Sequence, residues 1–397
     1  NRLRVITRLA ERQDIVGKPL PADRAILDNL LVQEPDRLRA LLRDYGIFPD
    51  ANLTMDDIDS VVVCSGPVLF AAVNQPEKWL ADAIGARNKP VVRVTSGGGT
   101  GLAGALAAVN QVRAGYANRV LVVAYDKLSE GALQYSISTL YDPFWGREFA
   151  VGIMGFSAAY WKSRMDLLGH SEEAAAMVSV KNHKNALLNP YAHVKKEITV
   201  EDVLNSKPLC WPIKLLDVPP ISDGACAIIL ASEDAAKKSE KPAWIRGMAY
   251  YSEAENAAHR SMIQSEPLTI AAAKVYRQAG ITNPRRQVDV VEVQEPYTCF
   301  ELSYYEGLGL CPSGGAAELV ASGATQIDGD IPVNPSGGCM GANPIGATAL
   351  IRLAEVAQQV RGKAGAYQID GAKVGVSQAG GGWANLRGVA VVSSEKG

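Results

Sequence analysis

The chain has 397 residues, 47% of them hydrophobic and 21% charged, which is enough material for two core-forming units. Its formal net charge of -2 excludes a general attraction to nucleic acid or to an anionic membrane. The six cysteines form no CxxC pair, so the sequence indicates neither a zinc site nor a disulfide framework. We find no apolar signal core and no run of about 18 apolar residues, and therefore expect a cytoplasmic protein without nucleic-acid, membrane or metal partners.

The first half of the chain begins with alternating strands and helices. Residues 57–66 ("DIDSVVVCSG") predict a short apolar strand, and residues 92–109 ("VRVTSGGGTGLAGALAAV") predict a strand, a glycine-rich turn and a helix. The helix from Leu102 to Val112 is apolar or small on nearly every face, so we expect it to be buried. Residues 119–127 ("RVLVVAYDK") predict another apolar strand.

Residues 128–220 interrupt this pattern with aromatic residues, prolines and charges, as in "YDPFWG" and "KNHKNALLNPYAHVKKEITVEDVLNSKPL". Long insertions on a rigid scaffold commonly carry ligand contacts, so we interpret this segment as a loop subdomain that covers a site. The following stretch, "ISDGACAIILAS" (221–232), predicts a buried strand with which the first half resumes.

The second half of the chain repeats the order of the first. Residues 287–296 ("QVDVVEVQEP") match residues 57–66, and residues 333–365, which contain a second Ser-Gly-Gly turn, match residues 94–115. An apolar strand follows each match, and in the second half it is residues 372–382 ("AKVGVSQAGGG"). One half-domain is therefore present twice.

Strands that alternate with helices argue for α/β units around mostly parallel sheets. We predict a layered sandwich in which the helix Leu102–Val112 packs on a second apolar helix, Ala347–Val360. The predicted halves are residues 1–235, which include the loop subdomain of about 128–220, and residues 236–397.

Four segments resemble the thiolase superfamily, in its sterol-carrier-protein-type and lipid-transfer-protein-like branch: "NALLNPYAH", "ITVEDVLNSKPL", "PISDGACAIILAS" and "VNPSGG…NPIGATALIR". The resemblance runs from about residue 55 to the end, and "RLRVIT" near the start is a candidate opening strand. It implies a layered α-β-α-β-α sandwich of two pseudo-symmetric halves with a loop subdomain. It also implies a coenzyme A thioester as substrate, with no permanently bound cofactor.

The resemblance does not carry over the reaction, because the family's catalytic positions hold other residues here. Gly98 stands where thiolases have the nucleophilic cysteine, and Asn343 stands where they have a histidine before a proline. Gln294 and Glu295 replace the family's Asn-Glu or His-Asp pair, and Gln378 replaces a late cysteine or histidine. Since glycine cannot form an acyl-enzyme, which needs a thiolate, acyl-cysteine chemistry at this turn is excluded.

The electrostatic part of such a site remains. Backbone N–H groups of Gly98 and Gly99 lie at a predicted helix N-terminus, and that of Gly380 lies in a second glycine turn. Such donors stabilise the oxyanion of a thioester that becomes an enolate. The three amide side chains at the replaced positions add neutral groups that can polarise a carbonyl.

Replacement reactive groups are few. Cys339, beside the second Ser-Gly-Gly turn, is the one substitute nucleophile, and its alternative interpretation is a small buried apolar residue. Tyr297 is the first candidate proton carrier, because cysteine-less aldolases of the superfamily use tyrosines in this region; the alternative is an aromatic residue of the core. Glu295 is a candidate general base if burial raises its pKa, and otherwise a structural carboxylate bonded to loop amides.

The insertion also contains candidate coenzyme A contacts. Lys181, Lys184 and His193 could meet the phosphates of coenzyme A, and a solvated charged face is the alternative interpretation. His170 and His259 lie in polar stretches, so we expect both on the surface.

Three functions fit these observations. The first, which we favour, is a retro-aldol lyase that cleaves a β-hydroxyacyl-CoA without an acyl-cysteine intermediate. The second is a thiolase or Claisen-type acyltransferase with an unusual nucleophile. The third is a non-catalytic thiolase-like subunit of a complex.

The resemblance further implies partners. Thiolase-fold proteins pair an edge strand across a twofold axis, and the apolar strand "RVLVVAY" suits that role in a homodimer. Members of this branch often bind a small protein with a zinc ribbon and an OB fold, whose metal would belong to that partner.

Overall fold

The computed structural model describes residues 53–67, 74–144, 146, 152–236, 239, 241–382 and 384–396. The candidate opening strand "RLRVIT" lies outside the described residues. The chain divides into two compact units, each treated separately below. The first comprises Asn1–Ala132, Ser222–Pro242 and Pro344–Ile351, and the second comprises Leu133–Ile221, Ala243–Asn343 and Arg352–Gly397.

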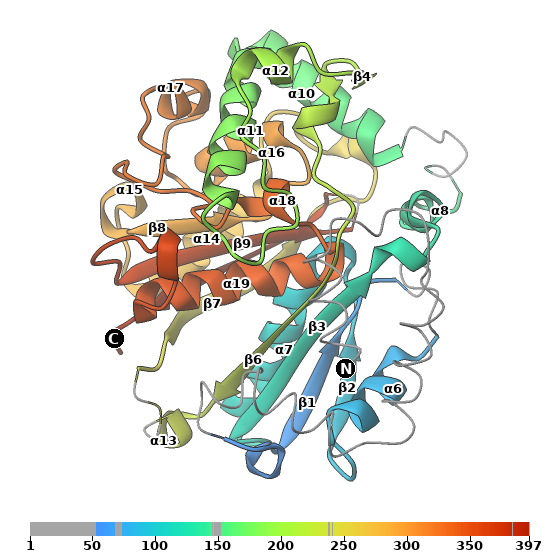
Figure 1. Cartoon of the computed structure of the whole chain (residues 1–397), viewed down its shortest axis with the longest axis vertical. Helices are drawn as coiled ribbons and strands as arrows, with labels where there is room; N and C mark the ends of the chain where they lie inside the picture. Colours follow the sequence, from blue (N-terminus) through green and yellow to red (C-terminus); the bar gives the residue numbers. More distant parts are fainter. Residues whose placement is uncertain are drawn as a thin grey trace. The chain divides into compact units, whose positions relative to one another are not determined.

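The first unit is built on a four-stranded sheet in the order β2-β1-β3-β6 (Figure 1). Strand β1 is parallel to both of its neighbours, and β6 is antiparallel to β3. β1 is apolar and buried along its whole length, as expected of a parallel strand covered on both faces. The strands are β1 (Ser60–Cys64), β2 (Val91–Val94), β3 (Arg119–Lys127) and β6 (Asp223–Ala231).

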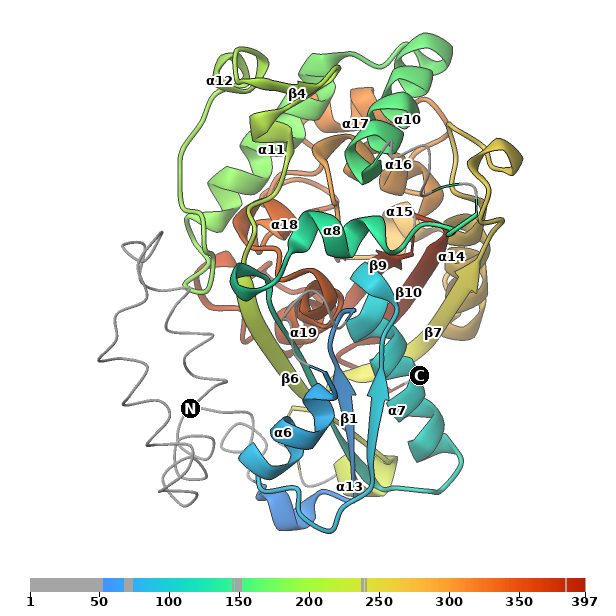
Figure 2. The same ribbon diagram turned by 90° about the vertical axis from the view of Figure 1, so that its right-hand side faces the viewer.

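Helices cover both faces of this sheet. Helix α6 packs through Leu80, and its C-cap residue Ile84 packs beside it, against Val61 and Val63 of β1. On the other face, Gly104 of α7 lies against Cys64, so α6 and α7 lie on opposite sides of β1 (Figure 2). The helical segments of this unit are η1 (Met55–Asp57), α6 (Pro76–Ala83), η2 (Gly97–Gly99), α7 (Thr100–Arg113), η3 (Leu128–Glu130) and α13 (Glu233–Ala236).

The prediction that "RVLVVAY" (residues 119–125) serves as an edge strand is wrong, because β3 is paired on both sides. Its second partner, β6, comes from residues about 100 positions further along the chain, and no local pattern reveals that pairing. Among the described strands, the two edges of this sheet are β2, where Val92 is 47% exposed, and β6.

Helix α7 packs on the first turns of α19 (Ile345–Arg361), whose residues 345–351 belong to the same unit. A Cβ at Gly101 would lie 2.3 Å from the backbone N of Leu350, so only glycine permits this approach. The predicted packing of the two apolar helices is therefore confirmed within this unit. Burial is less complete than predicted, because α7 buries one face, with Leu102, Ala105 and Ala108, and leaves the others partly exposed.

Asp126 is a buried carboxylate at the end of β3. Its two oxygens accept hydrogen bonds from the backbone N of Gly66 (2.8 Å) and the backbone N of Gly346 (2.6 Å), at the start of α19. Burial raises the pKa of Asp126 from 3.8 to about 7, although both backbone donors oppose this. The carboxyl group therefore links β3 to α19. It stays protonated up to a higher pH in the folded chain than in the unfolded chain.

This shift predicts a pH dependence. Between the unfolded pKa of 3.8 and the folded pKa of about 7, the folded state binds a proton that the unfolded state has lost, so stability falls as the pH rises through this window. Asp126→Asn should flatten the slope of unfolding free energy against pH, as measured by chemical denaturation at intervals across it. An unchanged slope in the variant would contradict the shift.

The second unit contains a four-stranded sheet in the order β7-β10-β9-β8. Strand β8 is parallel to β9, and β10 is antiparallel to both β9 and β7. Helix α14 packs on β7 and β10 (Figure 2). The strands are β7 (Trp244–Ser252), β8 (Val290–Val293), β9 (Val374–Gly381) and β10 (Leu386–Ser393), and the further helical segments are η5 (Ala257–His259), α14 (Glu266–Ala279), α15 (Pro284–Gln287), α16 (Thr298–Gly307), α17 (Ala316–Ala321), α18 (Gly338–Gly341) and η6 (Gly365–Tyr367).

Residues 133–221 of the insertion belong to this second unit. Helix α11 contacts α16, α17 and α18, so the insertion packs on the C-terminal half. The predicted halves follow the internal repeat, whereas this division follows packing. The elements of the insertion are α8 (Leu133–Ser138), α10 (Gly152–Leu168), α11 (Glu172–Ala186), α12 (Val200–Leu204), β4 (Pro208–Cys210), β5 (Ile213–Lys214) and η4 (Leu215–Asp217).

The internal repeat is visible in the strand order. In the first unit β1 is parallel to β3, which is antiparallel to β6; in the second, β8 is parallel to β9, which is antiparallel to β10. The counterpart of β2 is reduced to a single parallel bridge between Val291 and Val333, just before the second Ser-Gly-Gly turn. The sequence repeat therefore predicts a real repeat of topology.

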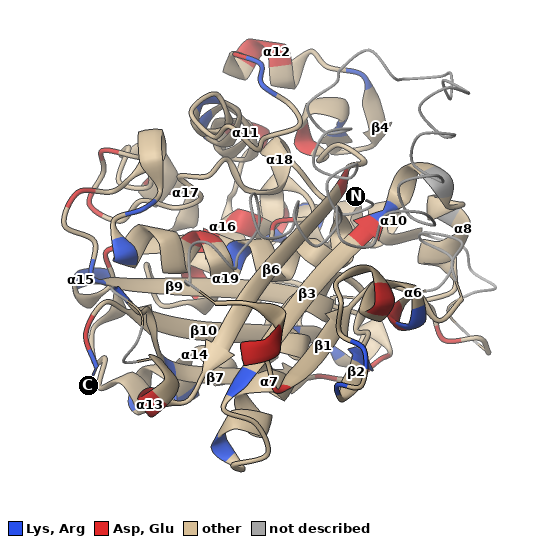
Figure 3. Ribbon diagram, turned by 60° about the horizontal axis from the view of Figure 1, so that its bottom comes forward, with Lys and Arg blue, Asp and Glu red and all other residues tan. Residues whose placement is uncertain are grey.

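Charged residues lie mainly on helices and loops (Figure 3). Strand β9 carries none, and β3 is uncharged from Val120 to Tyr125, as expected of strands that helices cover. In the part of the chain that the structure describes, no helix has the length and apolarity needed to cross a membrane.

Candidate active site

Two residues at predicted catalytic positions, Gln294 and Gln378, meet the predicted oxyanion donor Gly380 in the second unit, where β8 ends beside β9. The backbone N of Gln294 donates to the backbone O of Gln378 (3.2 Å) and approaches its Oε1 (3.3 Å). The backbone N of Gly380 donates in turn to Oε1 of Gln294 (3.2 Å). These contacts form an amide cluster, which we define as Gln294, Gln378 and Gly380.

Gln378 has an unused donor. Its side chain is fully buried, and Nε2 has no hydrogen-bond acceptor among the described residues. A buried amide N–H without a partner costs about 1–3 kcal/mol, so such groups require an explanation. A ligand carbonyl oxygen would supply the missing acceptor.

Glu295 follows Gln294 and clamps the second glycine turn. Its Oε1 accepts hydrogen bonds from the backbone N of Cys339 (2.7 Å) and from Asn182 Nδ2 (3.0 Å), and its Oε2 accepts one from Asn334 Nδ2 (3.1 Å). Burial and the nearby charge of Glu301 raise the pKa of Glu295 to about 8. The raised pKa meets the condition set for a general base, but the carboxylate is inaccessible and fully bonded, which favours the structural interpretation.

Glu301, one turn into α16, lies beside Glu295. It forms a fully buried ion pair with Lys181 of α11 (2.8 Å) and accepts a hydrogen bond from Tyr305 OH (2.5 Å). Asn182 and Asn334 each donate to Glu301 as well as to Glu295. The two asparagines therefore bridge the two acidic side chains, and the Lys181 ammonium offsets the charge of Glu301.

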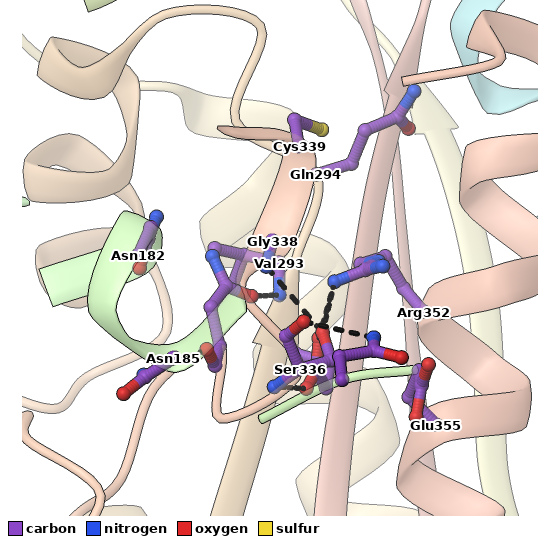
Figure 4. Close-up of polar contacts among 12 residues, drawn as sticks. Asn182, Asn185, Val293, Gln294, Ser336, Gly338, Cys339, Arg352 and Glu355 are labelled. Carbon is purple, nitrogen blue, oxygen red and sulfur yellow. Dashed lines mark hydrogen bonds and ion pairs between the residues drawn. The ribbon is translucent and has the colours of Figure 1, made fainter. Parts of the chain in front are cut away.

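A second buried network lies beneath the same loop (Figure 4). Arg352 of α19 donates to Glu292 (2.5 Å) and to Ser336 Oγ (2.6 Å), and Ser336 Oγ donates to Glu292 (2.8 Å). Figure 4 shows the loop that contains Ser336 between α11, which carries Asn182, and α19, which carries Arg352. The loop is therefore held from both sides by charged or amide side chains.

Most residues of these two networks were not predicted as site residues from the sequence. Asn182, Asn334, Glu292 and Arg352 come from four separate segments, and only folding brings them together. One signal was available for Asn334, because its place in "VNPSGG" suits the left-handed backbone conformation (φ 53°) that asparagine tolerates.

Cys339 is a poor nucleophile. It is fully buried, and burial together with the neighbouring Glu295 raises the pKa of its thiol well above the ordinary value. Burial also raises the pKa of the Cys64, Cys299 and Cys311 thiols. A reactive cysteine needs the opposite shift, so the apolar interpretation of Cys339 is favoured.

Tyr297 caps the N-terminus of α16 and is 5% exposed. Its ring lies 6.4 Å from that of Phe300 within the main hydrophobic core of the second unit. Burial raises the pKa of its phenol, so at neutral pH Tyr297 keeps its proton and can only donate it. Its catalytic role stays a prediction.

The three residues predicted to contact coenzyme A have different environments in the structure. Lys181 is fully buried in its ion pair with Glu301, so it does not present a charge to a phosphate, and this corrects the prediction for that residue. Lys184, three residues further along α11, is exposed. The backbone N of His193 donates to the O of Gly341 (2.9 Å), which ties this loop to α18. Coenzyme A binding by Lys184 and His193 stays a prediction.

The expectation for the histidines is half right. His259 is exposed, but His170 is buried against the ring of Trp161 (5.7 Å between centroids). His170 follows α10 at a turn into α11. Its polar neighbours in the sequence gave no indication of this contact with Trp161.

The predicted oxyanion donors Gly98 and Gly99 belong to the first unit. Gly99 N donates to Ser96 O (3.2 Å), and Thr100 Oγ1 donates to Gly97 O (2.6 Å), so the turn is closed by its own hydrogen bonds. Asn343, the last residue of its segment of the second unit, is half-buried. Oxyanion binding by Gly98, Gly99 and Gly380 stays a prediction.

Comparison with known proteins shows which family the chain belongs to. Residues 249–394 match the family described as thiolase C-terminal domain-like. The chain is 32% identical to an acetyl-CoA acetyltransferase of Methanothermobacter thermautotrophicus, over 88% of this chain and 92% of that protein. The chain belongs to the thiolase superfamily. It is also 30% identical to sterol carrier protein 2 of Rattus norvegicus over 75% of this chain, and the match spans only 57% of that longer relative.

A solved structure, "Ltp2-ChsH2(DUF35) aldolase", matches with a TM-score of 0.76 at 25% identity, covering 88% of this chain and 91% of that chain. The predicted fold class, a thiolase-like α/β fold, is thereby confirmed, as is its place among sterol-carrier-protein-type thiolases. Within the described ranges of this thiolase-superfamily chain, no three His, Cys, Asp or Glu side chains converge as metal ligands.

Proposed function

We propose that this chain makes or cleaves a carbon–carbon bond in an acyl-CoA by aldol chemistry, without an acyl-cysteine intermediate. The observation that carries the proposal is the unused, fully buried amide donor of Gln378. Gln378 stands at a position where thiolases have an ionisable residue. Its amide group can stabilise the negative charge of an oxyanion, but it cannot act as a nucleophile. The similar solved structure is an aldolase by name, which supports the same reaction class.

In the lyase direction the substrate is a β-hydroxyacyl-CoA. Water takes the hydroxyl proton, because no described side chain is left to act as the base; the hydroxyl carbon becomes a carbonyl group, the Cα–Cβ bond breaks, and its electron pair moves onto the thioester as an enolate. Nε2 of Gln378 donates to that enolate oxygen, and protonation at Cα releases the shortened acyl-CoA. The protonated Tyr297 suits the donation of that proton better than the uptake of the first one.

Acyl transfer requires a thiolate, which the buried Cys339 does not supply. One relative is named an acetyl-CoA acetyltransferase, so thiolytic acyl transfer is the second candidate function, and the experiment must distinguish it from aldol cleavage. A non-catalytic subunit is the third.

For assembly we propose a homodimer, in which the exposed edge of β2 takes the role first given to residues 119–125. The similar aldolase is named for two components, Ltp2 and ChsH2, which supports a second, small partner with a zinc ribbon and an OB fold.

The test is incubation with β-hydroxyacyl-CoA thioesters, alone and with any co-purifying partner, followed by mass spectrometry of small products and of the intact protein. The lyase predicts an aldehyde or ketone together with a shortened acyl-CoA, and no protein adduct. An acyl adduct on a cysteine would establish acyl transfer instead. Unchanged substrate in every condition would favour the non-catalytic subunit.

Gln378→Ala should reduce kcat by about 10²- to 10³-fold, the usual effect of removing one oxyanion donor. Gln326→Ala, in a turn of the same unit, is the matched control and should keep full activity. Tyr297→Phe should lower turnover by orders of magnitude if the phenol carries the proton; full activity would assign Tyr297 to the core alone.

A further inference from the structure

One buried arginine faces two acidic side chains in the second unit. Arg352 donates to Glu292 (2.5 Å), and Glu355 follows Arg352 by three residues on α19, a spacing that places both side chains on the same side of the helix. The charges of Arg352 and Glu355 act on each other. Figure 4 shows both side chains near the Ser336 loop, which we define as residues 333–341. All of these side chains are buried, so one guanidinium serves two acids away from water.

The guanidinium is bound to only one of the two acids. Among the described residues, Arg352 forms its ion pair with Glu292 and none with Glu355. The Nε of Arg352 is buried and has no hydrogen-bond acceptor in the described part of the chain. Because a buried donor without an acceptor is unfavourable, this nitrogen is available to a second carboxylate.

Glu355 is bonded to neutral groups instead. Its Oε2 accepts a hydrogen bond from Tyr367 OH (2.8 Å), and its carboxyl group also hydrogen-bonds to the side chain of Asn189. Asn189 Nδ2 in turn donates to the backbone O of Ser336 (2.9 Å). Arg352 Nη1 donates to Ser336 Oγ (2.6 Å). Glu355 is therefore connected to the Ser336 loop by two routes, one through the amide and one through the guanidinium.

The surroundings favour the neutral form of Glu355. Burial and the charge of Glu292 raise the pKa of Glu355 from 4.5 to about 7, and Arg352 opposes this shift only in part. Burial raises the pKa of Glu292 too, but its direct contact with Arg352 favours the charged form. The acid without that contact is the one that keeps a proton near neutral pH. The other ionisable groups that act on this network are Lys181 on Glu292, Cys339 and Glu295 on Arg352, and Tyr367 on Glu355.

We infer that Glu355 is a proton switch that controls the order of the Ser336 loop. While Glu355 is neutral, Arg352 stays on Glu292 and Ser336, and the loop is held. When Glu355 gives its proton to water, the new carboxylate attracts the guanidinium through the unused Nε. The hydrogen bond from Arg352 to Ser336 then weakens, and the loop opens more often. The switch goes beyond the proposed reaction and does not depend on it.

The experiment measures amide hydrogen exchange of the full chain by mass spectrometry, at about pH 6 and about pH 8. Each rate is divided by that of an unfolded peptide at the same pH, which gives a protection factor. The protection of residues 336–341 should fall by at least about tenfold between the two pH values, the usual effect of losing one charge-assisted hydrogen bond. Helix α14 should stay more protected than the loop at both pH values, which shows that the loop opens locally.

Glu355→Gln keeps this side chain neutral, so the loop should retain its protection at the higher pH. Glu318→Gln, which changes an exposed glutamate of the same unit, is the matched control and should leave the tenfold fall intact. Tyr367→Phe is the second variant. It removes a donor that favours the charged carboxylate, so the fall should begin at a higher pH with the same amplitude.

Three results would overturn the inference. The first is equal loop protection at both pH values in the unaltered chain. The second is a fall in Glu355→Gln as large as in the unaltered chain. The third is low protection of Glu355→Gln at both pH values, which would make Glu355 a structural residue rather than a switch. None of these results bears on the aldol proposal, which the product analysis tests separately.

Discussion

Lys181→Met is expected to lower the free energy of unfolding by about 3–5 kcal/mol, the cost of breaking a buried ion pair from one side. The ammonium and the Glu301 carboxylate are 2.8 Å apart and both are fully buried. Without Lys181, the buried Glu301 carboxylate would lose its counter-charge beside Glu295, whose pKa is already raised by burial and by the charge of Glu301. The Lys181 ammonium also donates to the O of Val333 (2.6 Å), which would lose that partner.

Chemical denaturation measures this effect, with Lys184→Met as the matched control. Lys184 lies on the same helix but is exposed, so its loss should change stability by less than about 0.5 kcal/mol. The double variant Lys181→Met/Glu301→Gln should recover part of the loss, because no unpaired charge of that pair remains. A loss below about 1 kcal/mol for Lys181→Met alone would mean that Glu301 is not a buried anion.

Gly338→Ala is expected to cost a similar amount, about 3–5 kcal/mol, from two sources. Gly338 has φ 58°, a left-handed conformation that alanine adopts at a cost of about 1–2 kcal/mol. A Cβ there would also lie 2.2 Å from Glu295 Oε1 and 2.7 Å from Asn334 Nδ2. The carboxylate would have to move, and its hydrogen bond to the backbone of Cys339 would be lost.

Gly371→Ala separates the two sources. Gly371 has φ 71°, but a Cβ there meets nothing within 4 Å, so this variant reports the backbone strain alone. We expect it to cost about 1–2 kcal/mol. Equal losses at the two positions would show that the collision with Glu295 does not contribute. A greater loss for Gly338→Ala, accompanied by reduced kcat, would link the carboxylate clamp to the geometry of the site.

The fold was largely readable from the sequence because its signals are local and repeated. The apolar runs at 57–66 and 287–296 became β1 and β8, and each starts the same parallel, then antiparallel, series of strands. Glycine-rich turns before two apolar helices predicted α7 and α19, and Gly101 allows them to touch. The lateral position of β3 was mispredicted because strand order depends on β6, which lies beyond the insertion.

The candidate site was readable only in part. Family motifs placed Gln294 and Gln378 at catalytic positions, and the structure brings them into contact through their backbones. The same sequence made Lys181 look like a surface cation, because a lone lysine carries no sign of burial. Its partner, Glu301, lies 120 residues away in the sequence and meets it only after α11 packs on α16.

Residue types at a few positions already limit the kinds of chemistry open to this protein. A glycine at residue 98 removes the acyl-cysteine, and amides at residues 294 and 378 remove proton carriers, whatever the fold does with them. Which polar groups are satisfied depends instead on the folded chain. Burial surrounds Glu295 with four donors and leaves Gln378 Nε2 with no acceptor among the described residues, because desolvation and hydrogen bonding depend on neighbours that are distant in the sequence.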